Sequence, residues 1–455
     1  MSDLLADVAA PTARNTASAA SADASVEEKH AQAVLNTFGA VQKAFVSGQG
    51  NYLLDADGKR YLDLLGGIAV SCLGHGHPAL VEAISAAAKS MLHTSNFFAT
   101  PAQVELAQRL IELSVPAELR PHSRVFLANS GTEANEAALK VALRFGGSQK
   151  QRLIALEGAF HGRTTGALSL THKEAYRLPF APFMREVTFV APGEQDALAR
   201  ELARGDVAAV FVEPIQGERG VRAVDADYLR AARRLCTEHG ALLVVDEVQT
   251  GAFRTGDFLA HHRAGIVPDV VTMAKSLGGG VPIGATLVIG EANCALLGPG
   301  SHGTTYGGNP LAAAAALAVL RTVSGQLRER IGELSAAWSQ ELARVEGVSE
   351  VRAYGLLVAL ELDQSEGEVP SSLVARELLK QGFIVNAVTP TALRLAPPYT
   401  LTDQEAASFT EALAATLAAL RAQASTPAQI STNHASAAPA ASDPAGETSS
   451  TKEER

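Results

Sequence analysis

The sequence is poor in cysteine. Its 455 residues include three, Cys72, Cys236 and Cys294, which show no CxxC spacing and cannot all pair with one another. This pattern excludes a scaffold built on disulfide bonds and is typical of a protein that folds in a reducing compartment. We therefore expect buried free thiols and a cytoplasmic location.

The sequence also lacks long apolar runs and an excess of positive charge. Its longest apolar stretch, PLAAAAALAVL, is far shorter than the roughly 20 residues of a membrane span. The net charge of -10 makes nucleic acid and anionic membranes poor electrostatic partners. The N-terminus has no basic region followed by an apolar one, so we expect no export signal. A local pocket for a small anion remains open.

Composition divides the chain into five parts. Both ends are rich in Ala, Ser, Thr and Pro and contain no aromatic residue, so they cannot bury enough surface to offset the entropy of ordering. The segment NYLLDADGKRYLDL predicts a hairpin. We predict a disordered leader at 1–28, an N-terminal segment with this β-hairpin at 29–75 that packs with the small domain, a large domain at 76–325, a small α+β domain at 326–423, and a disordered tail at 424–455.

Within the predicted large domain, helical stretches alternate with short apolar runs that lack polar alternation. The runs are SRVFLAN, RLIALEG, VAAVFVEPI, ALLVVDEV and VVTMA. Such runs suit strands buried on both faces of a mostly parallel sheet with helices as crossovers, which is an α/β fold. VRAYGLLVALEL and FIVNAVTPTALRLAPP predict strands of the smaller domain. Ligands of such a sheet lie beyond the carboxyl ends of its strands, so the residues that end the runs are candidates for a site.

Two of these run ends carry polar groups. Ser130 and Glu133 have capping-box spacing, so a helix should begin there, and Gly131 in its first turn leaves room for a phosphate. Asp246 ends a buried run, where a carboxylate needs a cationic or hydrogen-bonding partner. That partner is either a metal, with Glu247 and the pair His261-His262 as further ligands, or the protonated ring nitrogen of a heteroaromatic cofactor.

A lysine follows the next apolar run. Lys275 stands just before the glycines 278–280, where burial would lower the pKa of its amine and free that amine to form a Schiff base. A phosphate cradle, a carboxylate for a pyridinium nitrogen and such a lysine are together what pyridoxal phosphate needs.

Six motifs resemble those of the class III pyridoxal-phosphate aminotransferases, most closely the acetylornithine aminotransferase branch. They are NSGTEANEAALK, AFHGRT, EPIQGE, DEVQTG, AKSLGGGVPIGA and GTTYGGNPLA, in this order. The resemblance implies the fold type I of PLP-dependent aminotransferases, with a mostly parallel central sheet flanked by helices and a smaller α+β C-terminal domain. It also implies pyridoxal 5'-phosphate as cofactor, no metal, and a homodimer with shared active sites.

The resemblance further implies roles for single residues. Lys275 and Asp246 are catalytic: Lys275 bonds the cofactor, and Asp246 pairs with its ring nitrogen. The residues that bind the cofactor are Gly131, Thr132, Phe160, Asp246, Val248, Gln249, Lys275, and Thr305, which reaches the phosphate of the partner subunit. The residues that bind the substrate are Arg163, Glu218, Arg394, Thr304 and Ile68.

The arginines indicate the substrate. Arg163 would grip the carboxylate of the donor with two hydrogen bonds, and Arg394 would take the α-carboxylate of glutamate in the second half-reaction. Glu218 would shield Arg394 while an amine is bound. Ile68 stands where ornithine aminotransferases carry a tyrosine, which favours an acylated nitrogen. We expect transfer of the terminal amino group of N2-acetyl-L-ornithine to 2-oxoglutarate, giving N-acetylglutamate 5-semialdehyde and glutamate in arginine biosynthesis.

Other interpretations stay open. Ornithine, succinylornithine, succinyldiaminopimelate and 4-aminobutyrate are alternative substrates for the same chemistry. Arg219, Ala252 and Phe253 depart from the family pattern, and we expect them near the pocket rim, where they would affect specificity. An NAD-dependent dehydrogenase that uses the glycines after Lys275 is a remote alternative. Its glycine motif would follow the first strand and open a helix. Here the glycines lie late in the chain and precede Pro282.

Overall fold

The computed structural model describes residues 25–424 except 324, 366 and 368. The predicted leader and tail lie largely outside the described residues. α1 (Val26–Ala33) nevertheless begins inside the segment assigned to the leader. Ser25 Oγ accepts from the N–H of Glu28 at 3.1 Å, and Glu28 Oε2 accepts from the N–H of Ser25 at 2.7 Å. This capping box satisfies two N–H groups of the first turn, so residues 26–28 are helical and the leader prediction was wrong for them.

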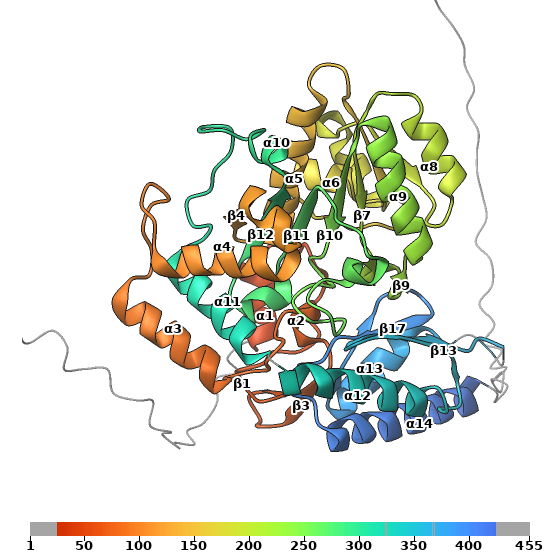
Figure 1. Cartoon of the computed structure of the whole chain (residues 1–455). Coiled ribbons are helices and arrows are strands. Elements are labelled where there is room, and N and C mark those ends of the chain that lie inside the picture. The colour runs from red at the N-terminus through yellow and green to blue at the C-terminus, as the bar shows by residue number, and fades with distance from the viewer. Residues whose placement is uncertain (1–24, 324, 366, 368, 425–455) are drawn as a thin grey trace, which may run out of the picture.

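A seven-stranded sheet forms the centre of the described structure, in the order β4-β12-β11-β10-β7-β5-β6 (Figure 1). Its neighbours run parallel except at β12, which is antiparallel to both β11 and β4. The five runs chosen from the sequence are all strands, whereas β6 and β12 were not predicted. The strands are β4 (Ser123–Ala128), β5 (Arg152–Leu156), β6 (Val187–Val190), β7 (Val207–Val212), β10 (Leu242–Asp246), β11 (Val270–Met273) and β12 (Gly284–Ile289).

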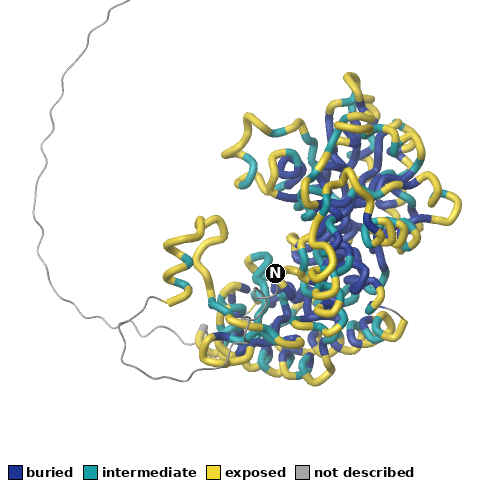
Figure 2. Tube along the Cα trace, turned by 90° about the vertical axis from the view of Figure 1, so that its left-hand side faces the viewer, coloured by how far each residue is buried: buried dark blue, intermediate teal, exposed yellow. Residues whose placement is uncertain are grey.

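Helices cover both faces of this sheet, which explains the absence of polar alternation. In β7, Ala209 and Phe211 pack with α5 (Gly131–Gly146), while Val210 and Val212 pack with α8 (Gln195–Leu202) and α9 (Ala226–His239). β7 is therefore apolar and buried at every position. Figure 2 shows the buried residues gathered in the interior and the exposed ones on the outer segments.

Further helices surround this core. None of the single helices in the described ranges has the length and apolar composition of a membrane span; α11 (Pro310–Thr322) and α12 (Gly325–Leu342) have them only when taken together as a bent pair. The remaining helices before the small domain are α2 (Gly66–Ala69), α3 (Pro78–Ser90), α4 (Pro101–Ser114), α6 (Thr165–Ser169), α7 (Glu174–Arg177), α10 (Glu291–Cys294) and α11 (Pro310–Thr322).

The small domain is an antiparallel sheet in the order β13-β14-β17-β16, covered by helices. The predicted capping box of the last helix is confirmed, since Glu405 N donates to Thr402 Oγ1 at 3.2 Å and Thr402 N donates to Glu405 Oε2 at 2.9 Å. The elements are α12 (Gly325–Leu342), β13 (Val348–Tyr354), β14 (Leu357–Leu362), α13 (Ser371–Gln381), β16 (Asn386–Ala387), β17 (Ala392–Leu395) and α14 (Asp403–Ala424).

The N-terminal segment forms its own sheet. The predicted hairpin is confirmed as an antiparallel pair, β2 with β3, and β15 from the C-terminal part of the chain adds to it in parallel. The strand that follows α13 thus ties the N-terminal segment to the C-terminal part of the chain. The strands are β1 (Ser47–Gln49), β2 (Tyr52–Leu54), β3 (Arg60–Asp63) and β15 (Phe383–Ile384).

Candidate active site

A cavity of about 380 Å³ lies at the carboxyl edge of the central sheet. Its lining includes the first turn of α5, Glu213 just after β7, Asp246 at the end of β10, and Lys275 shortly after β11. Because β7, β10 and β11 are parallel neighbours, their carboxyl ends bring these side chains to one place. The three features singled out in the sequence therefore share one cavity.

The start of α5 is suited to an anion. Ser130 Oγ accepts from the N–H of Glu133 at 3.2 Å, but the Glu133 carboxylate bonds to the N–H of the residue before Ser130, so only half of the predicted capping box forms. The other N–H groups of the first turn have no carbonyl one turn earlier. Gly131 is required here, since an added Cβ would lie 2.6 Å from Val248 Cγ1. Thr132 is in the same turn and also lines the cavity.

Asp246 is held by a set of donors. Its Oδ2 accepts from Asn135 Nδ2 and from His161 Nδ1, each at 2.7 Å, and its Oδ1 accepts from the N–H of Val248 at 2.9 Å. Burial lowers the pKa of His161, but the hydrogen bond and charge of Asp246 and the charge of Glu213 outweigh it, so the pKa is raised. This network fixes the direction in which Asp246 faces the cavity.

The metal interpretation of Asp246 finds no support among the described residues. No group of three or more His, Cys, Asp or Glu side chains there has the arrangement of a metal site. Glu247 instead accepts from the ring and the backbone N–H of His261, each at 2.8 Å, and both side chains are buried. The pair is thus a satisfied element of the core.

Glu213 lines the cavity but was not predicted as a site residue from the sequence. It is 6% exposed, and its Oε2 accepts from the N–H of Phe160 at 3.0 Å. Burial, with a contribution from the charge of Asp246, raises the pKa of its carboxyl to about 8. The signal was available, because Glu213 ends the run VAAVFVE just as Asp246 ends its own. Asn135 and His161 had no comparable signal.

We expect Glu213 to make stability depend on pH. A carboxyl whose pKa rises from 4.5 when unfolded to about 8 when folded contributes stability that is complete below about 4.5 and is lost as the pH rises through 8. Glu213→Gln should therefore flatten the decline of the urea midpoint between pH 5 and 8. Equal slopes for the two proteins would show that Glu213 does not titrate in this window.

Lys275 begins a tight turn, η5 (Lys275–Gly278), in a left-handed conformation with φ 48°. Burial lowers the pKa of its amine, and Arg394 lowers it further, while Glu218, Asp246 and Glu213 oppose the shift. A left-handed lysine persists only where the surroundings enforce it. The backbone is indeed crowded, since a Cβ on Gly279 would lie 2.8 Å from Val319 Cγ2. The glycines after Lys275 thus form a turn and do not open a helix, as a dinucleotide motif would.

Arg394 lies beneath a layer of polar groups. It is 2% exposed; its Nη1 donates to Glu218 Oε1 at 2.6 Å and to Gln249 Oε1 at 3.3 Å, and its Nη2 donates to Asn386 Oδ1 at 2.8 Å. Burial opposes ionisation of Glu218, but the charge and hydrogen bond of Arg394 outweigh it and lower the pKa of that carboxyl. Glu218 therefore covers Arg394 as a carboxylate.

Arg163 also lines the cavity and is exposed. Its guanidinium carbon lies 3.5 Å from the ring centroid of Tyr176 and 5.7 Å from that of Phe160. Stacking on Tyr176 leaves the edge of the guanidinium free to donate to a carboxylate. The sequence analysis did not identify Tyr176 as a site residue.

Four predicted residues lie outside the lining of this cavity. One is Arg394, which contacts the lining residues Glu218 and Gln249; the others are Thr304, Thr305 and Ile68. Thr304 and Thr305 border a second cavity next to His93 and Phe97, although Thr304 Oγ1 accepts from Asn129 Nδ2 at 3.1 Å, and Asn129 lines the first. Ile68 is 42% exposed and does not line the first cavity either. Their functional roles stay predictions.

None of the residues that depart from the family pattern lines this cavity, and the prediction that they lie at its rim was wrong for Phe253. Phe253 is 4% exposed, packs on Phe258, and lines a different cavity. Arg219 packs its stem on Gly158, whose Cβ would lie 2.6 Å from Arg219 Cδ. Ala252 accepts a hydrogen bond from Tyr399 Oη at 2.8 Å through its carbonyl. Ala252 and Phe253 are thus buried in packing, whereas Arg219 is exposed and follows the lining residue Glu218.

Comparison with known proteins agrees with this geometry. Residues 36–417 match the family "Aminotransferase class-III". The chain is 45% identical over 399 residues to the acetylornithine aminotransferase of Corynebacterium efficiens, covering 86% of this chain and 96% of that protein. It is 47% identical over 389 residues to the protein of that name from Mycolicibacterium smegmatis, covering 84% and 96%.

Solved structures show the same likeness. The ornithine aminotransferase of Toxoplasma gondii, whose structure has partial occupancy of PLP at the active site, superposes with a TM-score of 0.80 at 31% identity, covering 88% of this chain and 95% of that one. The N-acetylornithine aminotransferase of Stenotrophomonas maltophilia gives a TM-score of 0.72 at 35% identity, with coverages of 84% and 97%.

Proposed function

The chain belongs to the class-III aminotransferases and is a pyridoxal-phosphate-dependent transaminase, and from this we propose that it moves the terminal amino group of N2-acetyl-L-ornithine to 2-oxoglutarate. The observation that carries the proposal is one cavity lined by a helix N-terminus, Asp246 and Lys275, with the Arg394–Glu218 pair beside it. Relatives named for this substrate support the choice of donor.

The residues present fit the cofactor. The first turn of α5 and the hydroxyl of Thr132 suit its phosphate, and Asp246, already aligned by its donors, suits the protonated ring nitrogen. Phe160 and Val248 line the cavity where they can flank the ring, and Gln249 suits the ring hydroxyl. Lys275 is the amine that would bind the aldehyde carbon. When bound, pyridoxal phosphate supplies an electron sink for the substrate carbon that loses its proton.

Lys275 would also move that proton. Burial lowers the pKa of its amine and so favours the neutral form, which is the form that can act as a base. With the cofactor and substrate bound, the Lys275 amine would be the group of this chain best placed to take the proton from the substrate carbon and to return it two bonds away.

Two substrates of different charge use the same pocket. With an amine donor bound, Glu218 stays on Arg394 and neutralises it. With glutamate or 2-oxoglutarate, the Glu218 side chain rotates away and Arg394 donates hydrogen bonds to the carboxylate next to the reacting carbon. Thr304, through its contact with Asn129, and Ile68 complete the proposed substrate contacts; the apolar Ile68 favours an acylated nitrogen over a free ammonium.

Arg163 is proposed to hold the carboxylate of the donor. We expect Arg163→Ala to lower kcat/KM for N-acetylornithine about 10- to 100-fold, the effect of one lost charged contact. Arg163→Lys, which keeps the charge but not the paired donors, should lie between the variant and the wild type. Steady-state kinetics with varied donor measures this, and an unchanged KM in Arg163→Ala would remove Arg163 from the site.

A homodimer would complete the site. Phe97, Phe98 and Tyr306 are 93%, 65% and 63% exposed, and the cavity that contains Thr305 lies beside them. In a dimer a second copy covers these aromatic side chains, and Thr305 reaches the cofactor phosphate of the partner subunit. Thr305→Val should then weaken cofactor binding about tenfold, as for one lost hydrogen bond to a charged group, with the dimer intact. A fully active monomer in light scattering would contradict this arrangement.

The substrate assignment is tested by visible spectroscopy. The purified yellow holoenzyme is mixed with single amines, and the loss of its visible band is followed. We expect rapid bleaching by N-acetylornithine and slow bleaching by ornithine and 4-aminobutyrate. The bleaching rates with succinylornithine and succinyldiaminopimelate then rank these acylated donors against N-acetylornithine. Preferential bleaching by ornithine would replace the proposal with ornithine aminotransferase, the activity named for one of the structural neighbours.

A further inference from the structure

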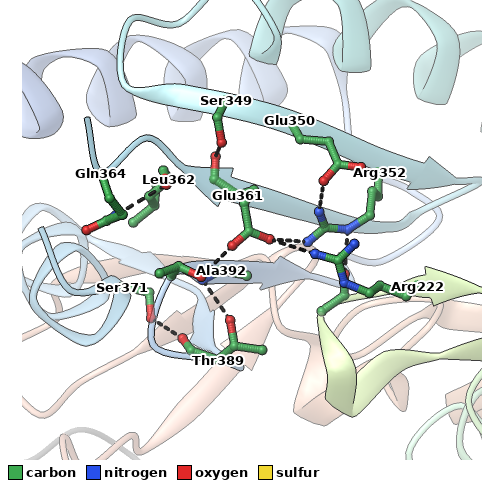
Figure 3. A network of polar contacts seen from close by, with 12 residues as sticks. Arg222, Ser349, Glu350, Arg352, Glu361, Leu362, Gln364, Ser371, Thr389 and Ala392 are labelled. Atoms are coloured by element: carbon green, nitrogen blue, oxygen red, sulfur yellow. Dashed lines mark hydrogen bonds and ion pairs between the residues drawn. The ribbon is translucent and has the colours of Figure 1, made fainter. Parts of the chain in front are cut away.

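One face of the small-domain sheet carries charged side chains in register (Figure 3). Arg352 of β13 pairs with Ala359 of β14, and Ala359 pairs with Arg394 of β17. Residues opposite one another across a sheet lie on the same face, so Arg352 and Arg394 share a face two strands apart. Glu361, two residues beyond Ala359 on β14, lies on that face as well.

The segment that carries Glu218 lies against this face. Besides the contact of Glu218 with Arg394 at 2.6 Å, the carbonyl of Gly220 accepts from Arg352 Nε at 2.8 Å, and Arg222 Nη2 lies 3.4 Å from Glu361 Oε2. Alternate positions of the segment, 218, 220 and 222, are therefore each attached to the small-domain sheet.

The middle attachment is the most enclosed. Arg352 is 7% exposed, and besides Gly220 it contacts Glu350 and, at 2.7 Å, Glu361. Gly220 has φ +85°, and a Cβ there would lie 3.2 Å from Arg352 Nη2. The next residue, Val221, is also left-handed at φ 56° although it is β-branched. A backbone in this conformation needs an external hold, and the guanidinium of Arg352 supplies it.

We propose that Arg352 is a positioning residue that holds the backbone beside Glu218, and thereby sets how strongly Glu218 competes with a substrate carboxylate for Arg394. This inference rests on the proposed exchange at Arg394. With the segment 218–222 fixed to the sheet, uncovering Arg394 requires rotation of one side chain only. A fixed backbone also presents the Glu218 carboxylate at its partner with little loss of entropy, which strengthens the covered state.

Loosening the segment should therefore affect the two half-reactions in opposite ways. In Arg352→Gln holoenzyme we expect the second-order rate constant for bleaching by N-acetylornithine to fall about tenfold, as for one lost hydrogen bond to a charged group. Arg394 is then less well covered when the donor binds. The rate constant for 2-oxoglutarate with the aminated holoenzyme should stay the same or rise, because its carboxylate displaces a weaker competitor.

Coupling to Glu218 is tested by a double-mutant cycle. In a Glu218→Gln background, Arg352→Gln should change either rate constant by less than about twofold, because the group through which it acts is gone. Arg352→Lys, which keeps one donor toward the Gly220 carbonyl, should recover part of the donor rate. Glu350→Gln is the matched control. Glu350 contacts Arg352 but takes part in none of the contacts described between the sheet and the segment 217–223, so both rates should match the wild type.

Equal losses in both half-reactions, or a full effect that persists in the Glu218→Gln background, would overturn the proposal. Should Arg352→Gln not fold, Arg222→Gln removes the more exposed attachment to Glu361. In this variant the rate constant for N-acetylornithine should fall about threefold, the effect of one exposed ion pair, while that for 2-oxoglutarate should stay the same or rise. Equal changes in the two rate constants would overturn the proposal here too. A wild type that N-acetylornithine does not bleach refutes the proposed substrate instead, so the two failures are distinguishable.

Discussion

The Lys275→Ala substitution is expected to lower the transamination rate at least about 10,000-fold, the upper end for removal of a general base. The amine both holds the cofactor and moves the substrate proton, and no other lysine lines the cavity in the described ranges. The variant should still bind pyridoxal phosphate through the first turn of α5 and Asp246, but with an absorption maximum close to that of the free aldehyde. Absorption spectra and a coupled assay measure both effects.

Lys140→Ala is the matched control for this prediction. Lys140 also belongs to α5, but it is exposed and contacts His302 at 3.0 Å outside the cavity. Its removal should leave the rate within about twofold, as for most surface substitutions. A Lys275→Ala enzyme that retained more than about one per cent of the rate would contradict the roles given to Lys275, because a loss of less than about 100-fold is smaller than general-base catalysis contributes.

The Asp246→Asn substitution is expected to lower kcat about 100- to 1,000-fold, the effect of removing one preorganised charge from the transition state. The amide keeps the size of the carboxylate but no longer stabilises a protonated ring nitrogen. It also presents a donor to Asn135 and His161, which now donate to Oδ2 at 2.7 Å. Because the charge acts on the bound cofactor, the visible band should shift as well as the rate.

Glu247→Gln separates this effect from damage to the core. Glu247 is the next residue, is equally buried, and pairs with His261 instead of facing the cavity. Loss of a charge from that pair should lower the urea midpoint, as expected when one partner of a buried pair is removed. The visible spectrum should not change. If Asp246→Asn also lowered only the stability and left the band in place, the assignment of Asp246 to the ring nitrogen would be wrong.

Much of the site could be predicted because the chemistry stands at the ends of strands. Asp246 and Lys275 follow apolar runs that form neighbouring parallel strands, β10 and β11, so order along the chain became proximity in space. The helix start at Ser130 was visible as a cap. These features depend on local pattern and on the handedness of parallel connections, both of which a single sequence carries.

The rest depends on contacts between distant segments. Asn135 and His161 meet Asp246 across 111 and 85 positions of the chain, and a buried asparagine or histidine has no pattern that distinguishes it from a core residue. Phe253 was placed near the pocket because it follows a site motif, but the chain turns there through two left-handed residues and carries it to another cavity. Its place next to a motif in the sequence therefore did not show which way its side chain points.

The central claim is that the amine of Lys275 is covalently joined to pyridoxal phosphate in the resting enzyme. Reduction of the holoenzyme with borohydride, followed by proteolysis and mass spectrometry, tests it directly. We expect one phosphopyridoxyl group per chain, on the peptide that contains Lys275, and none after prior bleaching with N-acetylornithine. A label on another lysine, or no label on a yellow protein, would contradict the account.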